Sequence, residues 1–416
     1  MNEHAPAFTI SAPDRRASAK PRDAAFYQDP YAFYSALHGG APTFLWEDYG
    51  HWCFTGFREV SALLRDKRFG REILHVMTRE ELGWAQPKAH TAAFDLTEKY
   101  SLLALEPPAH TRLRTLVNRA FVSRNVAQLR PRIERLANEL IDKLEPEGGT
   151  ELIHSFAAPI PAVIIAEMIG LPADMATQLV SWSNRMVQMY MFGVAHETEL
   201  DANQASEDFM AYLRGVISER RKVPKEDLLT HMLTSEVDGQ KLSEDEVMST
   251  AILLLNAGHE ATVHTTGNAV KTILESGLDT QALFATPEQT EATVEECLRF
   301  DAPLHMFTRY ALSDVTLDDG QSFKKGEVIG LMLGAANRDP SRFKDANTFD
   351  PFRTDGQNVS FGAGIHFCIG APLARIELQV ALSTLFRRLP NIRLASEPRY
   401  NNVYHFHGLE RLDVAW

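Results

Sequence analysis

The chain has 416 residues, 44% hydrophobic and 23% charged, which is typical of a globular protein with a large core. A formal net charge of −13 argues against general nucleic-acid binding, and no apolar run is long enough to span a membrane. Three cysteines fit a reducing compartment and the N-terminus lacks an apolar signal segment, so we expect a cytoplasmic protein.

The first hundred residues predict short elements. Residues 1–22 are rich in Pro, Ala and charge and are expected to be a flexible leader. A helix is predicted over 29–40, and residues 43–56 alternate as in a hairpin with its turn near Tyr49–Gly50. Residues 70–100 are expected to be irregular, and a loop of that length is usually functional or mobile.

A basic helix is predicted over 105–122. His110 and Arg114 lie four residues apart and therefore share one helical face, where two cationic donors suit a dianionic ligand. The alternative is a solvated basic stripe, since Arg112 and Arg119 are nearby.

Residues 126–222 are predicted to be mostly helical. Their middle, 182–193, is dense in methionine and aromatic residues. It is either a core helix or a soft lid over an apolar ligand, because methionine side chains adapt to irregular surfaces.

The longest predicted helix begins after Ser243, which forms a capping box with Glu246, and ends at Gly277. It has about 33 residues and a length of roughly 50 Å. At its centre, Ala257 and Gly258 remove side-chain bulk, as if a ligand passed close to the backbone.

Glu260 follows as an acid in an apolar stretch, flanked by His259 and His264. The alternative is a softened helix with one exposed glutamate. A further helix is predicted over 286–303, capped by Thr286 and Gln289.

The segment FGAGIHFCIG, residues 361–370, carries Cys368, with an amphipathic helix predicted from Gly370 or Ala371. A cysteine just before a helix N-terminus is favoured as a thiolate, and the glycines let a flat group lie against the backbone. Three roles are open for Cys368: nucleophile with His366 as base, zinc ligand, or haem ligand. Zinc lacks support because Cys53 and Cys297 have no CxxC spacing.

The C-terminal residues 402–416 predict a hairpin that places His405 and His407 on one face. No third metal ligand is evident, so a structural or pocket-lining role is favoured for both histidines.

FGAGIHFCIG resembles the ligand loop of the cytochrome P450 family, F-G-x-G-x-H-x-C-x-G, at every fixed position. Four more motifs resemble the family in the right order, and the resemblance covers roughly residues 24–416. It implies a mainly α, triangular domain over 23–416 with a long central helix and a small β-rich part built mainly from the N-terminal region. It also implies haem b (iron protoporphyrin IX) as cofactor.

The resemblance assigns Cys368 as the ligand of the haem iron and implies further site residues. The haem loop would include Phe361, Gly362, His366 and Gly370, and the propionates would meet His110, Arg114 and Arg309. Glu296 and Arg299, which by spacing alone would be a weak surface pair, match the family's E-x-x-R pair and would form a buried structural triad with Arg353.

The family pattern A-G-x-[DE]-T has one departure here. The acid is Glu260, but Ala261 stands at the threonine position, and Thr262 is turned by about 100° around the helix. The resemblance implies that the acid and threonine deliver protons to dioxygen. Three features would replace the threonine: a widened turn that re-aims Thr262, a water bridged to Glu260, or a substrate hydroxyl. We favour the water or the substrate hydroxyl.

The implied reaction inserts one oxygen atom of O2 into a small or medium apolar substrate, by hydroxylation or O-dealkylation. The sequence has no P-loop and no iron–sulfur cysteine spacing. Electrons are therefore expected from a separate ferredoxin and its NAD(P)H-dependent reductase, docking near Arg112, Arg119 and His366. The alternatives are a peroxide-dependent peroxygenase and a haem-thiolate protein that binds or isomerises its ligand without oxygenation.

Overall fold

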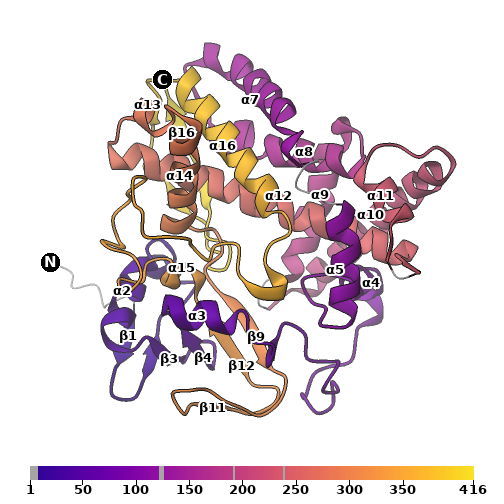
Figure 1. The fold of residues 1–416 in the computed structure, drawn as a ribbon, viewed down its shortest axis with the longest axis vertical. Helices are drawn as coiled ribbons and strands as arrows, with labels where there is room; N and C mark the ends of the chain where they lie inside the picture. Colours follow the sequence, from indigo (N-terminus) through magenta and orange to yellow (C-terminus); the bar gives the residue numbers. More distant parts are fainter. Residues whose placement is uncertain (1–7, 121–125, 191–192, 238) are drawn as a thin grey trace.

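The computed structural model describes residues 8–120, 126–190, 193–237 and 239–416. Helices make up most of the molecule, and a sheet lies along one edge (Figure 1). The helices are α1 (Ala24–Tyr27), α2 (Tyr31–Gly40), α3 (Phe57–Leu63), α4 (Ala92–Lys99), α5 (Ala109–Ala120), α7 (Arg130–Leu144), α8 (Pro159–Ile169), α9 (Ala176–Val187), α10 (His196–Lys222), α11 (Leu228–Thr234), α12 (Glu244–Ser276), α13 (Thr280–Leu283), α14 (Pro287–Phe300), α15 (Leu333–Ala336) and α16 (Ala371–Arg388). Shorter 3₁₀ or π-helical segments are η1 (Ala89–Thr91), η2 (Glu145–Glu147), η3 (Ile153–Ala157), η4 (Ala173–Met175), η5 (Gln188–Tyr190) and η6 (Gly364–His366).

The largest sheet has seven strands in the order β1-β2-β3-β4-β12-β9-β5, and a three-stranded sheet has the order β13-β16-β6. Three strand pairs, β10–β11, β14–β15 and β7–β8, complete the β structure of the described residues. The strands are β1 (Thr9–Ser11), β2 (Arg16–Ser18), β3 (Thr43–Trp46), β4 (His51–Phe54), β5 (Phe69–Gly70), β6 (Gly149–Glu151), β7 (Glu236–Val237), β8 (Gln240–Lys241), β9 (Phe307–Ala311), β10 (Val315–Thr316), β11 (Ser322–Phe323), β12 (Val328–Leu331), β13 (Arg393–Leu394), β14 (Arg399–Tyr400), β15 (Leu409–Arg411) and β16 (Asp413–Ala415).

Residues 9–18 differ from the flexible leader that was expected, because β1 and β2 join the large sheet and β2 pairs in parallel with β3. Arg15 fixes the turn between them by donating to the carbonyl of Thr43 at 3.1 Å and to Gln321 Oε1 at 2.8 Å. Buried Ala17 then joins a core cluster.

The predicted hairpin over 43–56 is confirmed, with Thr43 opposite Phe54 in an antiparallel β3–β4 pair. The irregular segment at 70–100 was only partly predicted, because it contains η1 and α4. The first N–H groups of α4 are capped from another helix: Asn203 Oδ1 accepts from Ala93 N at 2.8 Å. The local N-cap residue, Thr91, makes no capping hydrogen bond with its side chain.

The long predicted helix is α12, and its ends are as expected. Ser243 and Glu246 form a complete capping box, and Gly277 ends the helix in the left-handed conformation. α12 crosses the middle of the molecule and packs against α8, α9 and α16 (Figure 1). None of the helices, over the part of the chain described, is long and apolar enough to cross a membrane.

One helix-capping prediction and one strand-pairing prediction were wrong. Thr286 accepts from Gln289 N at 3.2 Å, but the Gln289 side chain donates to the carbonyl of Pro351 at 3.3 Å instead of closing a capping box. Residues 402–416 do not fold back on themselves either: β15 pairs with β14, and β16 pairs with β13 and β6.

The methionine-rich segment 182–193 lies partly in the core. Trp182 stacks on Phe209 with ring centroids 5.3 Å apart, and the Met186 side chain is fully buried. These contacts support the core alternative for α9. Residues 191–192 lie outside the described part of the chain.

Candidate active site

Cys368 lies between η6 and the first turn of α16. Its N–H donates to the carbonyl of Phe361 at 3.0 Å, which closes the loop. Gly364 has φ of +73°, and a Cβ there would lie 2.5 Å from the carbonyl oxygen of Leu64. The glycine therefore allows the loop to press against the chain that follows α3, and the predicted loop-to-helix arrangement is present.

The thiol of Cys368 is not activated by the helix alone. Burial raises its pKa, and the hydrogen bond from Gly370, the charge of Arg114 and the N–H of Ala371 offset this only in part. The expected thiolate therefore needs a further positive charge, such as a coordinated metal ion.

Imidazole and guanidinium groups gather beside this loop. The rings of His110, on α5, and His366 have centroids 4.5 Å apart. Arg114 donates to the carbonyl of Phe367 at 2.7 Å. Arg309, on β9, is 2% exposed and donates to the carbonyl of Thr308 at 2.8 Å.

The positive charge of this group is only partly balanced by the nearby carboxylate of Glu106. Burial, with the charge of Arg71, lowers the pKa of Arg309 to about 9. Burial also lowers the pKa of His110 to about 4, and His110 Nε2 is buried without a hydrogen-bond partner. Such groups are stabilised by acceptors that bring negative charge.

Glu106 and Arg71 are two further residues of this site that the motifs did not indicate. The carboxylate of Glu106, which is 8% exposed, accepts from the N–H of Arg71 at 2.6 Å and lies 3.2 Å from His366 Nε2. A cavity of about 200 Å³ is lined by Glu106, Arg309 and His366 among others. An acid directly before Pro107 in the basic motif was the one available signal for Glu106.

The middle of α12 has two small side chains, Ala257 and Ala261, that are not fully covered by neighbouring residues. Ala257 is exposed and Ala261 half-buried, and the two lie four residues apart on one face of an otherwise buried helix. The Glu260 side chain is 25% exposed and lies 3.7 Å from His264 Nε2. An acid thus stands next to a face that leaves room for a ligand.

Thr262 does not replace the missing threonine in this arrangement. Its side chain is buried and donates to the carbonyl of Gly258 at 3.1 Å. Because α12 is a continuous α-helix over all its residues, the widened turn that would re-aim Thr262 is absent from it.

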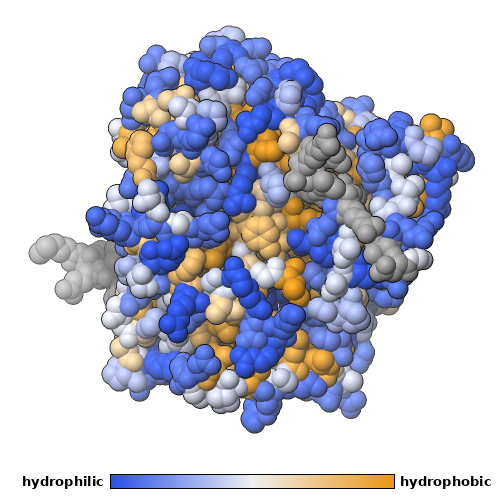
Figure 2. Space-filling model, in the orientation of Figure 1, coloured by the Kyte–Doolittle hydropathy of each residue, from blue (hydrophilic) through white to orange (hydrophobic). Residues whose placement is uncertain are grey.

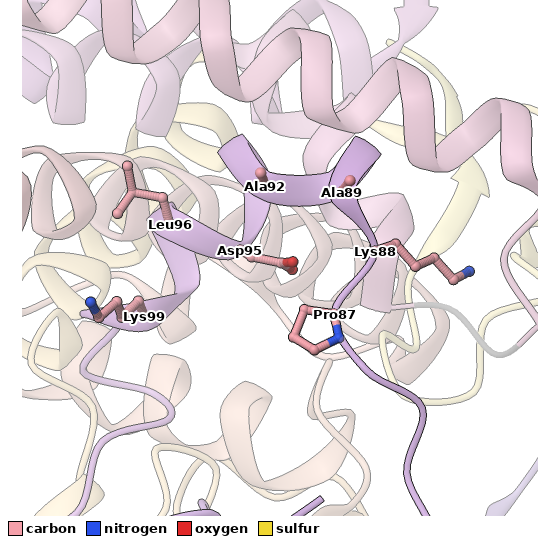
Figure 3. Close-up of a pocket in the computed structure, with 7 residues that line it drawn as sticks. All are labelled: Pro87, Lys88, Ala89, Ala92, Asp95, Leu96 and Lys99. Atoms are coloured by element: carbon pink, nitrogen blue, oxygen red, sulfur yellow. The ribbon is translucent and has the colours of Figure 1, made fainter.

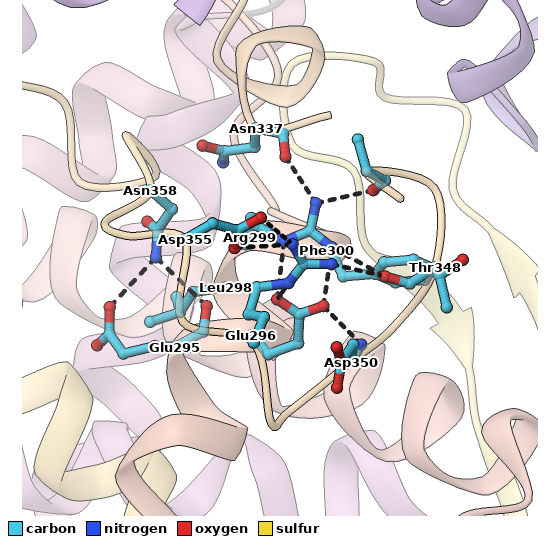
Figure 4. A network of polar contacts seen from close by, with 12 residues as sticks. Glu295, Glu296, Leu298, Arg299, Phe300, Asn337, Thr348, Asp350, Asp355 and Asn358 are labelled. Carbon is cyan, nitrogen blue, oxygen red and sulfur yellow. Dashed lines mark hydrogen bonds and ion pairs between the residues drawn. The ribbon is translucent and has the colours of Figure 1, made fainter. Parts of the chain in front are cut away.

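Glu296, Arg299 and Arg353 form the expected triad, in which Glu296 and Arg299 are buried and the Arg353 side chain is 10% exposed. Figure 4 shows the pair of Glu296 and Arg299. Glu296 pairs with Arg299 at 2.7 Å and with Arg353 at 2.9 Å. The Arg299 guanidinium also donates to the carbonyls of Asn337 and Ala346, each at 2.8 Å. The triad therefore joins α14 to the segment that leads to the Cys368 loop.

The expected docking residues are partly engaged elsewhere. Arg112 forms an ion pair with Glu246, and the His366 side chain is 8% exposed beside Glu106. The side chain of Arg119 lies outside the described part of the chain. The Arg112 side chain is still 32% exposed, so docking of a partner protein near these residues stays a prediction.

Comparisons with known proteins agree with this site. The cytochrome P450 family model matches residues 71–276 and 268–391. The polyketide biosynthesis cytochrome P450 PksS of Bacillus subtilis is 34% identical, with 95% of this chain and 98% of that protein covered. The mycinamicin IV hydroxylase/epoxidase of Micromonospora griseorubida is 36% identical over 88% of this chain and 89% of that protein.

Solved structures also agree. P450BioI, in complex with acyl carrier protein ligated to hexadec-9Z-enoic acid, superposes with a TM-score of 0.85 at 33% identity, covering 94% of this chain and 99% of that one. CalO2 gives a TM-score of 0.88 at 29% identity, with 96% and 98% covered. The mainly α fold with small sheets is therefore that of these proteins.

The residues present fit a haem. Cys368 offers a sulfur ligand, and Gly370 leaves the space before it open, since a Cβ there would meet nothing closer than Cys368 Sγ at 3.8 Å. The unpartnered His110 and the buried Arg309 are suited to carboxylates of the size and charge of haem propionates. The chain belongs to the cytochrome P450 family of haem-thiolate monooxygenases.

Proposed function

We propose that the protein inserts one oxygen atom of O2 into a small or medium apolar molecule, by hydroxylation or O-dealkylation, with haem b as cofactor. The observation that carries the proposal is the position of Cys368 at the start of α16, beside the buried basic residues of α5 and β9. Relatives named as hydroxylases, including the vitamin D(3) 25-hydroxylase of Pseudonocardia autotrophica at 33% identity, support the reaction type.

The chain supplies binding, orientation and protons. His110, Arg114, Arg309 and His366 would hold the haem carboxylates, and Cys368, with Phe361, Gly362 and Gly370 around it, would hold the iron. A haem with a thiolate ligand supplies oxygen activation, because thiolate donation favours O–O cleavage. The small face formed by Ala257 and Ala261 leaves room for the substrate.

Glu260 is the proposed proton donor site on α12. The methyl side chain of Ala261 can form no hydrogen bond. The hydroxyl of Thr262 donates to the carbonyl of Gly258 in the same helix. A water held by Glu260, or a hydroxyl of the substrate, would therefore carry the proton from the carboxyl group. His264 Nε2 lies 3.7 Å from that carboxylate.

Electrons would come from a ferredoxin and its NAD(P)H-dependent reductase. The Cys368 loop exposes Ile365 and Phe367, with 38% and 40% of their surface accessible. Figure 2 shows apolar side chains in the middle of the face on which this loop lies in Figure 1. An apolar patch with a polar rim is suited to a transient partner.

The test is turnover under ¹⁸O2 with a substrate selected by its blue shift of the Soret band. We expect one ¹⁸O atom in the product and dependence on ferredoxin and reductase. Faster turnover with hydrogen peroxide than with ferredoxin and reductase would favour the peroxygenase alternative. The alanine at position 261, where the family pattern has threonine, supports that alternative. Ligand binding with neither O2 consumption in the presence of reductant nor turnover with hydrogen peroxide would contradict both and favour a non-oxygenating protein.

A further inference from the structure

A second cluster of metal-binding side chains lies away from Cys368, where η1 meets the beginning of α10. It consists of His90, on η1, and of His196 and Glu199, on the first turn of α10. One possible ligand atom from each residue lies within 4.8 Å of the other two. His196 and Glu199 are three residues apart, so both point to the same side of α10.

The two imidazoles meet at one carboxylate oxygen. His90 Nε2 lies 2.8 Å and His196 Nδ1 lies 3.6 Å from Glu199 Oε2. The rings are nearly perpendicular, with centroids 4.5 Å apart. Imidazole nitrogens and a carboxylate oxygen are the ligands that Zn²⁺ takes in proteins, often three of them with water in the fourth position.

The cluster is open to ions from solution. The Glu199 side chain is 10% exposed, but the side chains of His90 and His196 are 31% and 65% exposed. The carboxylate is therefore fixed by its surroundings, while the imidazoles can adjust by the small movement that a tetrahedral ion requires.

Lys88 is the natural competitor for this position. Its ammonium group pairs with Glu199 Oε1, and its side chain is 52% exposed. Figure 3 shows Lys88 among the residues that line an open groove of about 400 Å³, together with Pro87, Ala92 and Lys99. An incoming cation can therefore displace Lys88 into water.

We propose that His90, His196 and Glu199 bind a divalent transition-metal ion such as Zn²⁺, with water completing the coordination. The ion would join η1 and α4 to α10, two parts of the chain already linked by the bond from Ala93 N to Asn203. This inference does not depend on the proposed reaction.

The test is calorimetric titration of the haem-loaded protein with ZnCl2. We expect saturable binding of one ion. His90→Ala and His196→Ala should each weaken it at least about tenfold, since even an outer-shell substitution costs about 10–100-fold. Lys88→Ala should tighten binding because it removes the competing cation. Hydrogen exchange should slow in residues 88–99 when Zn²⁺ is added.

His154→Ala is the matched control. His154 is 80% exposed and pairs with Glu151 at 2.7 Å, also three residues apart, but this pair has no third ligand among the described residues. Binding should be unchanged in this variant. Absence of binding to the wild-type protein, or binding that survives His90→Ala unchanged, would overturn the proposal.

Discussion

Ala261 is the residue at which this chain departs most clearly from its family pattern. A methyl group replaces a hydroxyl beside Glu260, and Thr262 is bonded to Gly258 on the buried side of α12. Neither Ala261 nor Thr262 therefore offers a hydroxyl to Glu260, and a water molecule or the substrate must supply that hydrogen bond. How well protons are delivered should then depend on what occupies that position.

Ala261→Thr tests this account. A new hydroxyl should compete with the water or the substrate hydroxyl, so the fraction of electrons lost as peroxide should change by about fivefold, the effect of one hydrogen bond of about 1 kcal/mol. The measurement is peroxide formed per NAD(P)H consumed in the reconstituted system. Ala257→Thr, one turn earlier on the same face, is the control and should alter substrate affinity more than coupling. Unchanged coupling in Ala261→Thr with the true substrate would contradict the account.

The loop before α16 is the element on which the site depends most. Gly364 has φ of +73° and a backbone carbonyl, that of Leu64, 2.5 Å from where its Cβ would be. Gly50, in the β3–β4 turn, has φ of +70° and no neighbour within 4 Å of such a Cβ. The two glycines share a positive φ of nearly the same size and differ in how crowded their surroundings are.

Alanine substitutions at these two glycines should therefore separate strain from contact. Gly50→Ala should cost about 1–2 kcal/mol, the usual cost of a left-handed L-residue. Gly364→Ala should cost at least about 1–3 kcal/mol more, because the loop must also move away from Leu64. Thermal unfolding and haem retention of the holoprotein measure both. Equal losses in the two variants would show that the contact with Leu64 carries no energy.

How far the elements could be predicted depends on where their stabilising groups come from. α12 was predicted to its ends because Ser243, Glu246 and Gly277 are local signals. α4 was not, because its N–H groups are capped by Asn203, 110 residues away in sequence from Ala93. β16 was misassigned for the same reason: its partners are β13 and β6, and strand pairing over such separations leaves no local pattern.

The same distinction applies to the site. Cys368, the Glu296 triad and the basic residues of α5 follow from motifs. Other contacts join segments that are far apart in the sequence and meet only in the folded protein. They are the pairs Arg112–Glu246 and His366–Glu106. These two contacts pair Arg112 and His366 with carboxylates that the sequence did not indicate as their partners.

At the scale of the whole molecule, the Glu296 triad joins α14 to the chain between 337 and 355. Glu296 and Arg299 are each 2% exposed, and Glu296 also accepts from the N–H of Asp350 at 2.8 Å. Its neighbour Glu295 pairs with Arg375 at 2.5 Å, but both of those side chains are 31% exposed. The two adjacent glutamates each pair with an arginine, and the main difference between them is that Glu296 is buried and Glu295 is partly exposed.

Glu296→Gln should destabilise the protein by about 3–5 kcal/mol, because it leaves the buried guanidinium group of Arg299 without its counter-charge, whereas Arg353 keeps its ion pair with Asp355. Glu295→Gln should cost no more than about 1 kcal/mol, as expected for an exposed pair. Denaturant unfolding of the haem-loaded protein provides the comparison. A similar loss in both variants would mean that the triad does not hold these segments together.

The most direct test of the account is X-ray absorption at the iron edge of the ferric holoprotein. We predict a sulfur atom in the iron coordination shell of the wild-type protein, and its replacement by nitrogen or oxygen in Cys368→His. An iron shell with only nitrogen and oxygen in the wild-type protein, or a sulfur signal that survives the substitution, would contradict Cys368 as the haem ligand.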